Sequence, residues 1–315
     1  MSARVTVLTG GVGGAKLALG LCHAMSAGNV TAIVNTGDDF THLGLAISPD
    51  IDTLLYTLAG KANPTQGWGR AQESWSFMEA IRSLGGEDWF ALGDGDLALH
   101  VLRTHRLRAG EPLSAIIADF AVAWRIPAKI LPMSNDCVAT RVLTQEGELD
   151  FQHYFVKQQC APTVRAIRFA GAPEASAAPG VVEALRDEDS RAILIAPSNP
   201  FLSIDPILAV PSIRQALMET RVPVIAVSPI VGGTAVKGPT AKIMRELGLE
   251  VSADTVSRHY GDVIDGMLID ERDPPTALDL PHARADTLMK TLEDRVRVAR
   301  AALDLADSLK VPRKL

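Results

Sequence analysis

The sequence has no long hydrophobic run, and only 5% of its residues are aromatic. Its longest unbroken apolar segments, such as Ala192–Ala196 and Val224–Val227, are far shorter than the ~20 residues that a membrane-spanning helix needs. The first residues, MSARVTVLTGG, run straight into a strand-like segment and lack the apolar stretch and cleavage site of a signal peptide. We therefore expect a cytoplasmic protein.

Cysteine and basic charge are also scarce. The three cysteines, Cys22, Cys137 and Cys160, are widely spaced and form no CxxC pair, so we expect free thiols and neither a disulfide framework nor a zinc site. The net charge is −6, from 31 basic and 37 acidic residues, which argues against a general nucleic-acid-binding protein. The 315 residues suffice for one large domain or two modest ones.

One pattern recurs along the chain: a short apolar run is followed at once by a polar turn that contains glycine or proline. These runs are Val5–Leu8, Thr31–Val34, Trp89–Leu92, Ala128–Leu131, Ala192–Ala196 and Val224–Val227. Segments with helical periodicity lie between them, at Lys16–Met25, Asp52–Leu58, Glu73–Leu84 and Ser212–Thr220. Strands that alternate with helices indicate an α/β fold with a parallel sheet, whose ligands bind beyond the carboxyl ends of the strands.

Two regions depart from this pattern. Residues 141–170 suggest a hairpin that turns at Gln145–Glu148, followed by a further strand. We therefore expect a smaller inserted region at 141–190 between the core segments 1–140 and 191–315. Near the end, apolar residues from Leu288 to Ala306 recur every three or four positions, which predicts an amphipathic helix that packs on the sheet or on a second subunit.

The first polar turn is rich in glycine. Residues 5–16 read VTVLTGGVGGAK, so a strand leads into glycines and then into a helix that opens near Ala15. Glycines allow close backbone approach, and a helix N-terminus supplies free N–H groups, so the natural guest is a phosphate or diphosphate. The candidate residues are Gly10, Gly11, Gly13, Gly14 and Lys16. The spacing is not that of a Walker-type NTPase, and a tight packing turn is the alternative interpretation.

Acidic residues occur in the next two motifs along the chain. In NTGDDF, Asp38 and Asp39 are adjacent carboxylates that suit Mg²⁺ held together with substrate phosphates, although a solvated turn is the alternative. In SPDIDT, we expect Ser48 to cap a helix whose first turn carries Asp50, which needs no ligand to explain it.

Further polar residues are expected at the same edge. In LGDGDLALH, Asp94 and Asp96 precede His100, which lies one helical turn after Asp96 and is more often a paired helix residue than a metal ligand. The segments MSND (133–136), PSNP (197–200) and SPIVGG (228–233) offer amides and hydroxyls that suit a base, a sugar or a flavin-like edge. The sequence has no GxSxG elbow and no HExxH motif, so covalent catalysis is not indicated, whereas phosphoryl-type transfer needs mainly positioning and charge neutralisation.

Taken together, the motifs resemble those of the 2-phospho-L-lactate transferase family of coenzyme F420 biosynthesis. The similarity runs in order over nearly the whole chain. The motifs are GGVGGAKL, VNTGDDF, SPDIDTLLYTLAG, GWG (67–69), ALGDGDLALH with HRLRAGEPL, LPMSND, APSNPFLSIDPILAVP, VSPIVGG and RADTLM.

The resemblance implies a Rossmann-like three-layer parallel sheet with a smaller appended α+β region, and a homodimer. It implies transfer of a phospholactyl-type group from a guanosine diphosphate-linked donor to the ribityl hydroxyl of the deazaflavin Fo, with Mg²⁺ and release of GMP. The acid of the donor is phospholactate, phosphoenolpyruvate or phosphoglycerate in different family members, and the sequence does not choose among them.

The resemblance also implies site residues. Gly10, Gly11, Gly13, Gly14 and Lys16 would hold the donor diphosphate, and Ser198 and Asn199 would hold its guanosine. Asp38 would bind Mg²⁺ with Asp39 beside it, and Asp38 or Asp50 would accept the proton. The residues expected to contact Fo are Asp50, Asp94, Asp96, Asn135 and Asp136.

The sequence departs from the family pattern at some positions. Gly95 stands where the family commonly has arginine, and Asn135 stands where aspartate is frequent. Two other classes of protein remain as alternatives to the transferase. A regulator of a related family with the same fold would bind a nucleotide-sugar without turnover, and a dehydrogenase would need a nicotinamide cofactor, against which the imperfect GxGxxG motif argues.

Overall fold

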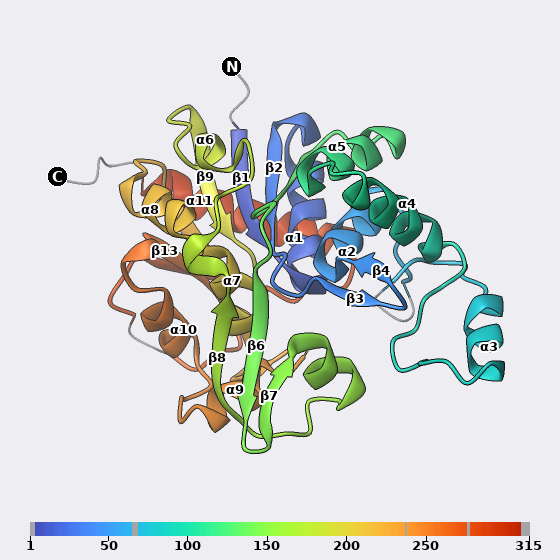
Figure 1. Ribbon diagram of the computed structural model, residues 1–315. Coiled ribbons are helices and arrows are strands. Elements are labelled where there is room, and N and C mark those ends of the chain that lie inside the picture. Colours follow the sequence, from blue (N-terminus) through green and yellow to red (C-terminus); the bar gives the residue numbers. More distant parts are fainter. Residues whose placement is uncertain (1–3, 65–68, 237, 276–277, 310–315) are drawn as a thin grey trace.

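A computed structural model describes residues 4–64, 69–236, 238–275 and 278–309. Its centre is a seven-stranded sheet in which every neighbouring pair is parallel, in the order β14-β13-β10-β9-β1-β2-β5 (Figure 1). The strands are β1 (Arg4–Thr9), β2 (Val30–Val34), β5 (Lys129–Pro132), β9 (Ser190–Ile195), β10 (Val224–Val227), β13 (Gly266–Asp270) and β14 (His282–Ala285). The parallel α/β sheet expected from the sequence is therefore confirmed.

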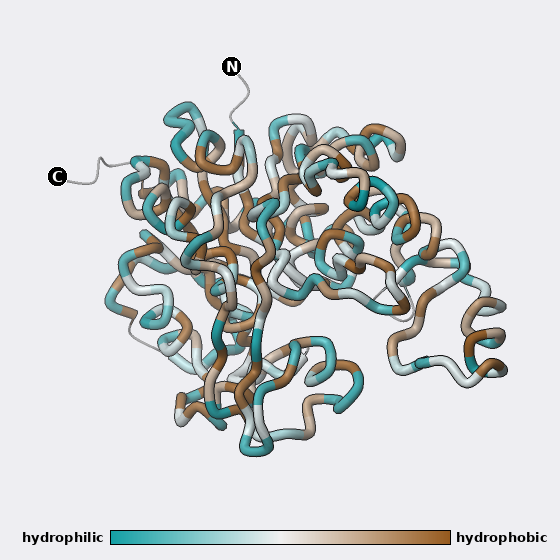
Figure 2. Tube along the Cα trace, viewed as in Figure 1, coloured by the Kyte–Doolittle hydropathy of each residue, from teal (hydrophilic) through white to brown (hydrophobic). Residues whose placement is uncertain are grey.

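Helices cover both faces of this sheet and form two separate cores, so the fold has three layers. The strand β9 shows the alternation: Ala192 and Leu194 belong to one core, and Ile193 and Ile195 belong to the other. All four residues are fully buried. A strand that is apolar on both faces reads as a continuous hydrophobic run, which is why the sequence pattern found it. Figure 2 shows hydrophobic stretches along these central strands.

The helices divide between the two faces. One core holds α1 (Gly11–Ala24), α2 (Pro49–Leu58), α5 (Leu113–Ala123) and α11 (Leu292–Ser308). The other holds α6 (Val181–Leu185), α7 (Asp205–Leu208), α8 (Pro211–Glu219), α9 (Thr240–Glu246) and α10 (Ala253–Tyr260). The chain crosses from β1 to β2 and β5 on one side, then returns to β9 and continues to β14 on the other. The strand order thus reverses between β1 and β9.

Smaller elements extend beyond the carboxyl ends of the strands. A three-stranded antiparallel sheet contains β6 (Ala139–Thr144), β7 (Gly147–Asp150) and β8 (Val164–Ala170), and a π-helical turn, η2 (His153–Lys157), lies between β7 and β8. Thr144 pairs with Gly147, so the predicted hairpin is confirmed. Short hairpins join β3 (Phe40–His42) to β4 (Leu45–Ile47) and β11 (Ile230–Val231) to β12 (Thr234–Ala235).

A second extension, which we call the arm, comprises the described residues between Lys61 and Gly95. It carries α3 (Ser76–Ser83) at the edge of the molecule and leads into α4 (Asp96–Arg108) (Figure 1). Its small hydrophobic core contains Met78 and Leu92. The remaining elements are the 3₁₀ turns η1 (Ala27–Asn29), η3 (Ala172–Glu174) and η5 (Gly261–Val263) and the π-helical turn η4 (Pro200–Ile204).

Three local expectations were wrong. Trp89–Leu92 is not a strand but an irregular part of the arm, where Leu92 packs in the small core. Helix α1 begins at Gly11 and not near Ala15, so the glycines lie in its first turn. Ser48 precedes α2 as expected, but its hydroxyl donates to Asp39 Oδ2 and does not cap the helix.

The structure has the amphipathic helix expected near the end of the chain and the free cysteines expected from their spacing. Helix α11 buries Val298, Ala302 and Leu303 against the sheet, whereas its use in a dimer stays a prediction. All three cysteines are free. Within the described ranges, no helix has the length and apolar character needed to span a bilayer.

Helix α1 packs on α11 through a glycine, which gives a test of the core. A Cβ atom at Gly20 would lie 2.2 Å from the carbonyl oxygen of Arg295, a backbone atom that moves only with α11. We expect Gly20→Ala to lower the free energy of unfolding by about 1–3 kcal/mol, because overpacking displaces a helix. Urea denaturation measures this change. Gly28→Ala is the control, since its nearest neighbour would be 4.0 Å away, and equal stability of the two variants would contradict the packing described.

Candidate functional site

A cavity of about 920 Å³ lies at the carboxyl ends of the strands, where the strand order reverses between β1 and β9. Such a switch point is where open α/β sheets bind ligands, because the loops on its two sides run in opposite directions and leave a crevice. The cavity is lined by the start of α1, by one side of α2, and by residues within segments 197–203, 228–236, 238–240 and 287–290. The arm and η2 complete it.

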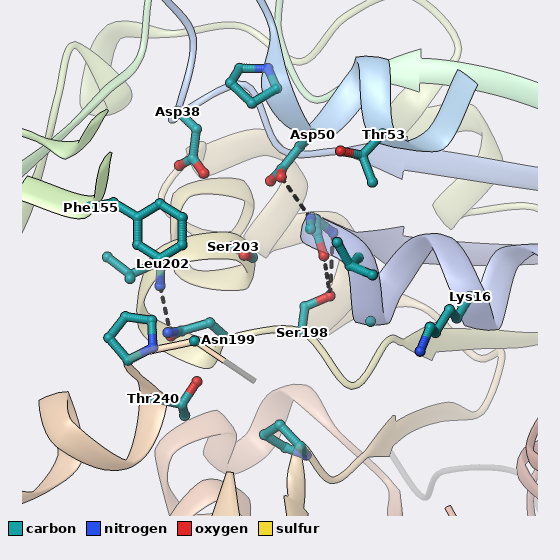
Figure 3. Close-up of a pocket in the computed structure, with 18 of the residues that line it drawn as sticks. Lys16, Asp38, Asp50, Thr53, Phe155, Ser198, Asn199, Leu202, Ser203 and Thr240 are labelled. Atoms are coloured by element: carbon teal, nitrogen blue, oxygen red, sulfur yellow. Dashed lines mark hydrogen bonds between the residues drawn. The ribbon is translucent and has the colours of Figure 1, made fainter. Parts of the chain in front are cut away.

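The glycine loop lies at one end of the cavity and is held by two side chains. The N–H of Gly11 donates to Asp50 Oδ1 over 2.7 Å (Figure 3). Ser198 Oγ donates to the carbonyl of Gly10 over 2.7 Å and also receives the Gly10 N–H at 3.3 Å. Gly11 has a φ of 62°, which favours glycine. The loop therefore has a fixed shape before any ligand binds.

The other predicted members of the loop have different surroundings. Gly13 lines the cavity, whereas Gly14 does not and instead packs against β1, since a Cβ atom there would lie 2.0 Å from Thr9 Oγ1. Lys16 lines the cavity too, and its ammonium group donates to the carbonyl of Met289 over 2.8 Å. Lys16 thus connects α1 to the segment 287–290.

Asp38 and Asp50 are two buried carboxylates beside the loop. Burial raises the pKa of Asp50 to about 6, although its bonds from Asn35 and Gly11 oppose this change. Burial, together with the nearby charge of Asp50, raises the pKa of Asp38 well above its ordinary value. Both side chains line the cavity (Figure 3). Asn35 orients the pair, because its amide donates to Asp50 while its oxygen accepts from the N–H of Gly37.

The two carboxylates fit a hard cation such as Mg²⁺. Asp38 Oδ1 is buried and has no hydrogen-bond partner among the described residues, so one strong acceptor is available for a ligand. Nowhere in the described parts of the chain do three His, Cys, Asp or Glu side chains cluster as a metal site. A cation here would therefore share two protein carboxylates with oxygens of a bound phosphate, which is the usual mode of Mg²⁺.

Asp39, the second predicted metal ligand, points elsewhere. Its Oδ2 accepts the hydroxyl of Ser48 over 2.7 Å, and it is not among the residues that line the cavity. Burial raises its pKa well above the usual value, and the charge of Arg103 opposes this rise. The carboxylate that the structure brings together with Asp38 is therefore Asp50, which lies in the first turn of α2.

Ser198 and Asn199, which follow β9, have distinct tasks. The Ser198 hydroxyl is occupied by Gly10, as described above. Asn199 Oδ1 accepts the N–H groups of Phe201 and Leu202 at 3.0 and 3.2 Å and so caps η4. Because these bonds fix the oxygen, the amide Nδ2 is the free end of the side chain, and it is buried without a partner among the described residues. Asn199 therefore offers one hydrogen-bond donor to a ligand.

A network of charged side chains forms the floor of the cavity along α2 and α4. Arg103 is fully buried and makes a two-pronged contact with Asp52, in which Nη1 lies 3.1 Å from Oδ2. His100 Nε2 lies 3.1 Å from Asp96 Oδ2, and its Nδ1 lies 3.6 Å from Asp52 Oδ2. Tyr56 donates to Asp96. Burial opposes ionisation of Asp96, but the contacts with His100 and Tyr56 outweigh it and hold its pKa below the ordinary value.

Aromatic rings from the arm and from η2 line a further part of the cavity. We call this the aromatic end, defined by Trp89 and Phe90 of the arm and by Phe151 and Phe155 at η2. Phe151 and Phe155 are stacked with ring centroids 5.3 Å apart. The sequence analysis missed these residues, because Trp89 was assigned to a strand and Phe155 carries no motif. The only signal was the local concentration of rings in a chain poor in aromatics.

Three residues predicted to contact Fo lie away from the cavity lining. Asp94 accepts from Ser74 Oγ and from two backbone N–H groups at the start of α3. Asn135 accepts the N–H of Ser114, and Asp136 accepts the N–H of Ser176. Each thus has a local structural contact, and its role toward Fo stays a prediction. Asp50 and Asp96 do line the cavity. Of the GWG motif, Gly67 and Trp68 lie outside the described residues, and Gly69 lines the cavity.

The buried ion pair of the floor gives a test of its energetics. We expect Arg103→Met to lower the free energy of unfolding by about 3–5 kcal/mol, because it leaves the Asp52 carboxylate buried without its counter-charge. Urea denaturation measures the loss. The double variant Asp52→Asn with Arg103→Met removes the stranded charge and is expected to recover part of the stability. A double variant no more stable than Arg103→Met would show that the pair does not act in this way.

Comparisons with known proteins agree with the resemblance. The sequence model of the family described as 2-phospho-L-lactate transferase CofD matches residues 5–304. A phosphoenolpyruvate transferase from Streptomyces griseus is 42% identical over 318 residues, which cover 98% of this chain and 99% of that protein. A phosphoenolpyruvate transferase from Mycolicibacterium smegmatis is 38% identical over 324 residues, which cover 96% of this chain and 98% of that protein.

Solved structures show the same fold at lower sequence identity. A crystal structure of a UPF0052 family protein from Bacillus halodurans superposes with a TM-score of 0.63 at 16% identity, covering 96% of this chain and 99% of that chain. A second structure from that organism gives a TM-score of 0.59 at 17% identity, covering 93% and 90% of the two chains. The family match spans almost the whole chain and includes every segment that lines the cavity. The chain therefore belongs to the 2-phospho-L-lactate transferase CofD family, the transferases of coenzyme F420 biosynthesis.

Proposed function

We propose that the protein transfers a phosphoenolpyruvyl group from a guanosine diphosphate-linked donor to the terminal ribityl hydroxyl of Fo, with Mg²⁺, and releases GMP. The observation that carries this proposal is one cavity lined by the glycine loop at the start of α1, by the carboxylates of Asp38 and Asp50 and by the aromatic end. The choice of phosphoenolpyruvate over phospholactate or phosphoglycerate follows the names of relatives about 40% identical in sequence.

Helix α2 sets the order of these parts. Asp50 in its first turn bonds the glycine loop, and Tyr56 bonds Asp96 in the cavity floor. Six residues of helix separate the two by roughly 9 Å along the axis. A donor phosphate at the loop and the ring of Fo elsewhere in the same cavity would leave the flexible ribityl chain to bring its hydroxyl to the phosphate.

The donor diphosphate would bind at the N-terminus of α1. Val12 and Gly13 line the cavity in the first helical turn, where backbone N–H groups have no acceptor within the helix. The partial positive charge of the helix end attracts phosphate, but the carboxylates of Asp38 and Asp50 repel it. Mg²⁺, when bound by these carboxylates, would neutralise charge on the phosphate oxygens. Asn199 Nδ2 would donate to the nucleoside.

In the proposed reaction, the ribityl oxygen of Fo attacks the phosphorus that carries the enolpyruvyl group. A new P–O bond forms, the P–O bond to the GMP phosphate breaks, and GMP leaves with the electron pair. The hydroxyl proton passes to Asp38 or Asp50, the two carboxylates that line the cavity beside the loop, at an oxygen that the cation leaves free.

A turnover assay tests the reaction. Purified protein is mixed with Fo, Mg²⁺ and one of the three guanosine diphosphate-linked donors, and mass spectrometry follows GMP and the phosphodiester product. We expect the phosphoenolpyruvyl donor to give product fastest, and EDTA to abolish product until Mg²⁺ is restored. Product with another donor alone would overturn the choice of acid. No product with any donor, together with tight binding of a nucleotide-sugar, would instead support a regulator.

The placement of Asp38 and Asp39 predicts which of the two substitutions has the larger effect on turnover. Asp38→Ala is expected to leave the fold intact and to lower turnover at least ~100-fold, as when one charge-stabilising element is lost. Asp39→Asn is expected to lower it much less, because Asp39 faces Ser48 and not the cavity. Steady-state rates with saturating Fo and donor measure both, and circular dichroism checks the fold. Near-normal rates for Asp38→Ala would remove Asp38 from the mechanism.

A further inference from the structure

Residues 286–290, which we call the strap, connect β14 to α11, and residues 287–290 of the strap line the cavity. The strap begins directly after Ala285, which is paired with Asp270, the last residue of the neighbouring strand β13. Asp270 therefore lies beside the start of the strap, at the carboxyl end of the sheet. It is fully buried and is not among the residues that line the cavity, so it has no part in the reaction proposed above. Its buried carboxylate needs another explanation.

The Asp270 carboxylate holds the strap through Thr287. Its Oδ2 accepts both the N–H and the hydroxyl of Thr287, each over 2.8 Å. Its Oδ1 accepts the N–H of Arg272 over 2.9 Å and lies 2.9 Å from Arg272 Nε. Burial opposes ionisation of Asp270, but the bonds from Arg272 and Thr287 outweigh it and hold its pKa below the ordinary value. Because hydrogen bonds to an ionised carboxylate are stronger than those to a neutral group, Asp270 fixes the strap firmly.

Two residues beyond Thr287, the strap contacts Lys16. The carbonyl of Met289 accepts a hydrogen bond from the Lys16 ammonium over 2.8 Å. Lys16 extends from the second turn of α1, close to the glycine loop, and lines the cavity (Figure 3). A lysine side chain has many rotamers, and an ammonium without a fixed acceptor samples a wide space. The Met289 carbonyl restricts this freedom, and the place of that carbonyl depends on the strap.

The charge of the cavity makes the place of this ammonium important. Four aspartates line the cavity, whereas the basic side chains that line it among the described residues are Lys16, Lys290 and His100. His100 lies 3.1 Å from Asp96, so its interaction is with the floor. A guanosine diphosphate-linked donor carries negative charge on each phosphate and needs the few cations present. An ammonium that is already held on the cavity side loses less conformational entropy when a phosphate binds.

We propose that Asp270 is a positioning residue, which acts through the strap to hold the Lys16 ammonium where it binds the diphosphate of the donor. This inference rests on the proposed function, since it takes the donor to be a guanosine diphosphate derivative. It adds that a carboxylate outside the cavity lining controls the affinity for the donor. The effect of Asp270 is therefore indirect and passes through one lysine.

Binding of GDP tests this inference without turnover. Isothermal titration calorimetry in the presence of Mg²⁺ gives the dissociation constant of GDP, and a separate titration gives that of Fo. We expect Asp270→Asn to raise the dissociation constant of GDP about threefold to tenfold, as for loss of one preorganised side chain, and to leave that of Fo unchanged. Thr287→Val keeps the buried carboxylate and removes one of its bonds, so it is expected to raise the constant about threefold or less.

A double-mutant cycle separates action through Lys16 from a general loss of order. Lys16→Met is expected to weaken GDP binding at least as much as Asp270→Asn does. If Asp270 acts through Lys16, the double variant binds GDP no more weakly than Lys16→Met, because the ammonium to be positioned is already gone. Multiplication of the two effects in the double variant would overturn the inference.

Steady-state kinetics give a readout that a purely structural role would not change. Asp270→Asn is expected to raise the KM for the donor at unchanged KM for Fo, because it weakens a contact made when the donor binds. Partial unfolding would instead lower the apparent kcat and leave both KM values as they are in the wild type. A fall in kcat with no change in the KM for the donor would contradict the positioning role.

The matched control is Asp265→Asn. Asp265 directly precedes β13 and accepts the N–H of Val224 over 2.8 Å, so it also holds backbone, but at the amino ends of the strands. Equal weakening of GDP binding by Asp265→Asn and Asp270→Asn would overturn the inference. Wild-type affinity for GDP in Asp270→Asn would overturn it alone, whereas a wild-type protein that binds no GDP would end both the proposed function and the inference.

Discussion

Ser198 Oγ donates a hydrogen bond to the carbonyl of Gly10 and thereby joins the end of β9 to the end of β1. These strands are adjacent in the sheet but 180 residues apart in the chain, and the strand order reverses between them. Because the loops beyond them diverge, the crevice at this point is open to a ligand. The glycine loop on one side and the segment 197–203 on the other are then held in a fixed relation, and the remaining parts of the site are built around them.

The carboxylates that line the cavity differ in whether a basic side chain neutralises them. Four carboxylates line it, from Asp38, Asp50, Asp52 and Asp96, and the buried Arg103 offsets the charge of Asp52 from below. Asp38 and Asp50 have no such ion pair among the described residues, and burial raises the pKa of both carboxyl groups, as it does for Asp52 despite Arg103. The floor network therefore belongs to the fold, whereas Asp38 and Asp50 line the cavity beside the glycine loop.

Local sequence patterns predicted much of the core and the part of the cavity at the glycine loop. Five of the six apolar runs are strands of the sheet, because strands buried on both faces must be continuously apolar. The glycine loop, Asp38 and Asp50 are all at the cavity, since turns after parallel strands meet at one edge. The sequence was less informative for the aromatic end. Trp89–Leu92 has the composition of a strand, but its apolar residues pack within the arm, and spacing gives no sign of which side they face.

The sequence by itself determined the parallel α/β class, the glycine loop and the presence of acidic residues after the strands, because each depends on residues within one short segment. Only the tertiary structure decided which carboxylates lie together. Asp39 is next to Asp38 in the chain but turns toward Ser48, while Asp50 lies beside Asp38 through its bonds to Asn35 and Gly11. It likewise decided that Trp89 meets η2, since contacts between distant segments depend on how the whole chain packs and not on local spacing.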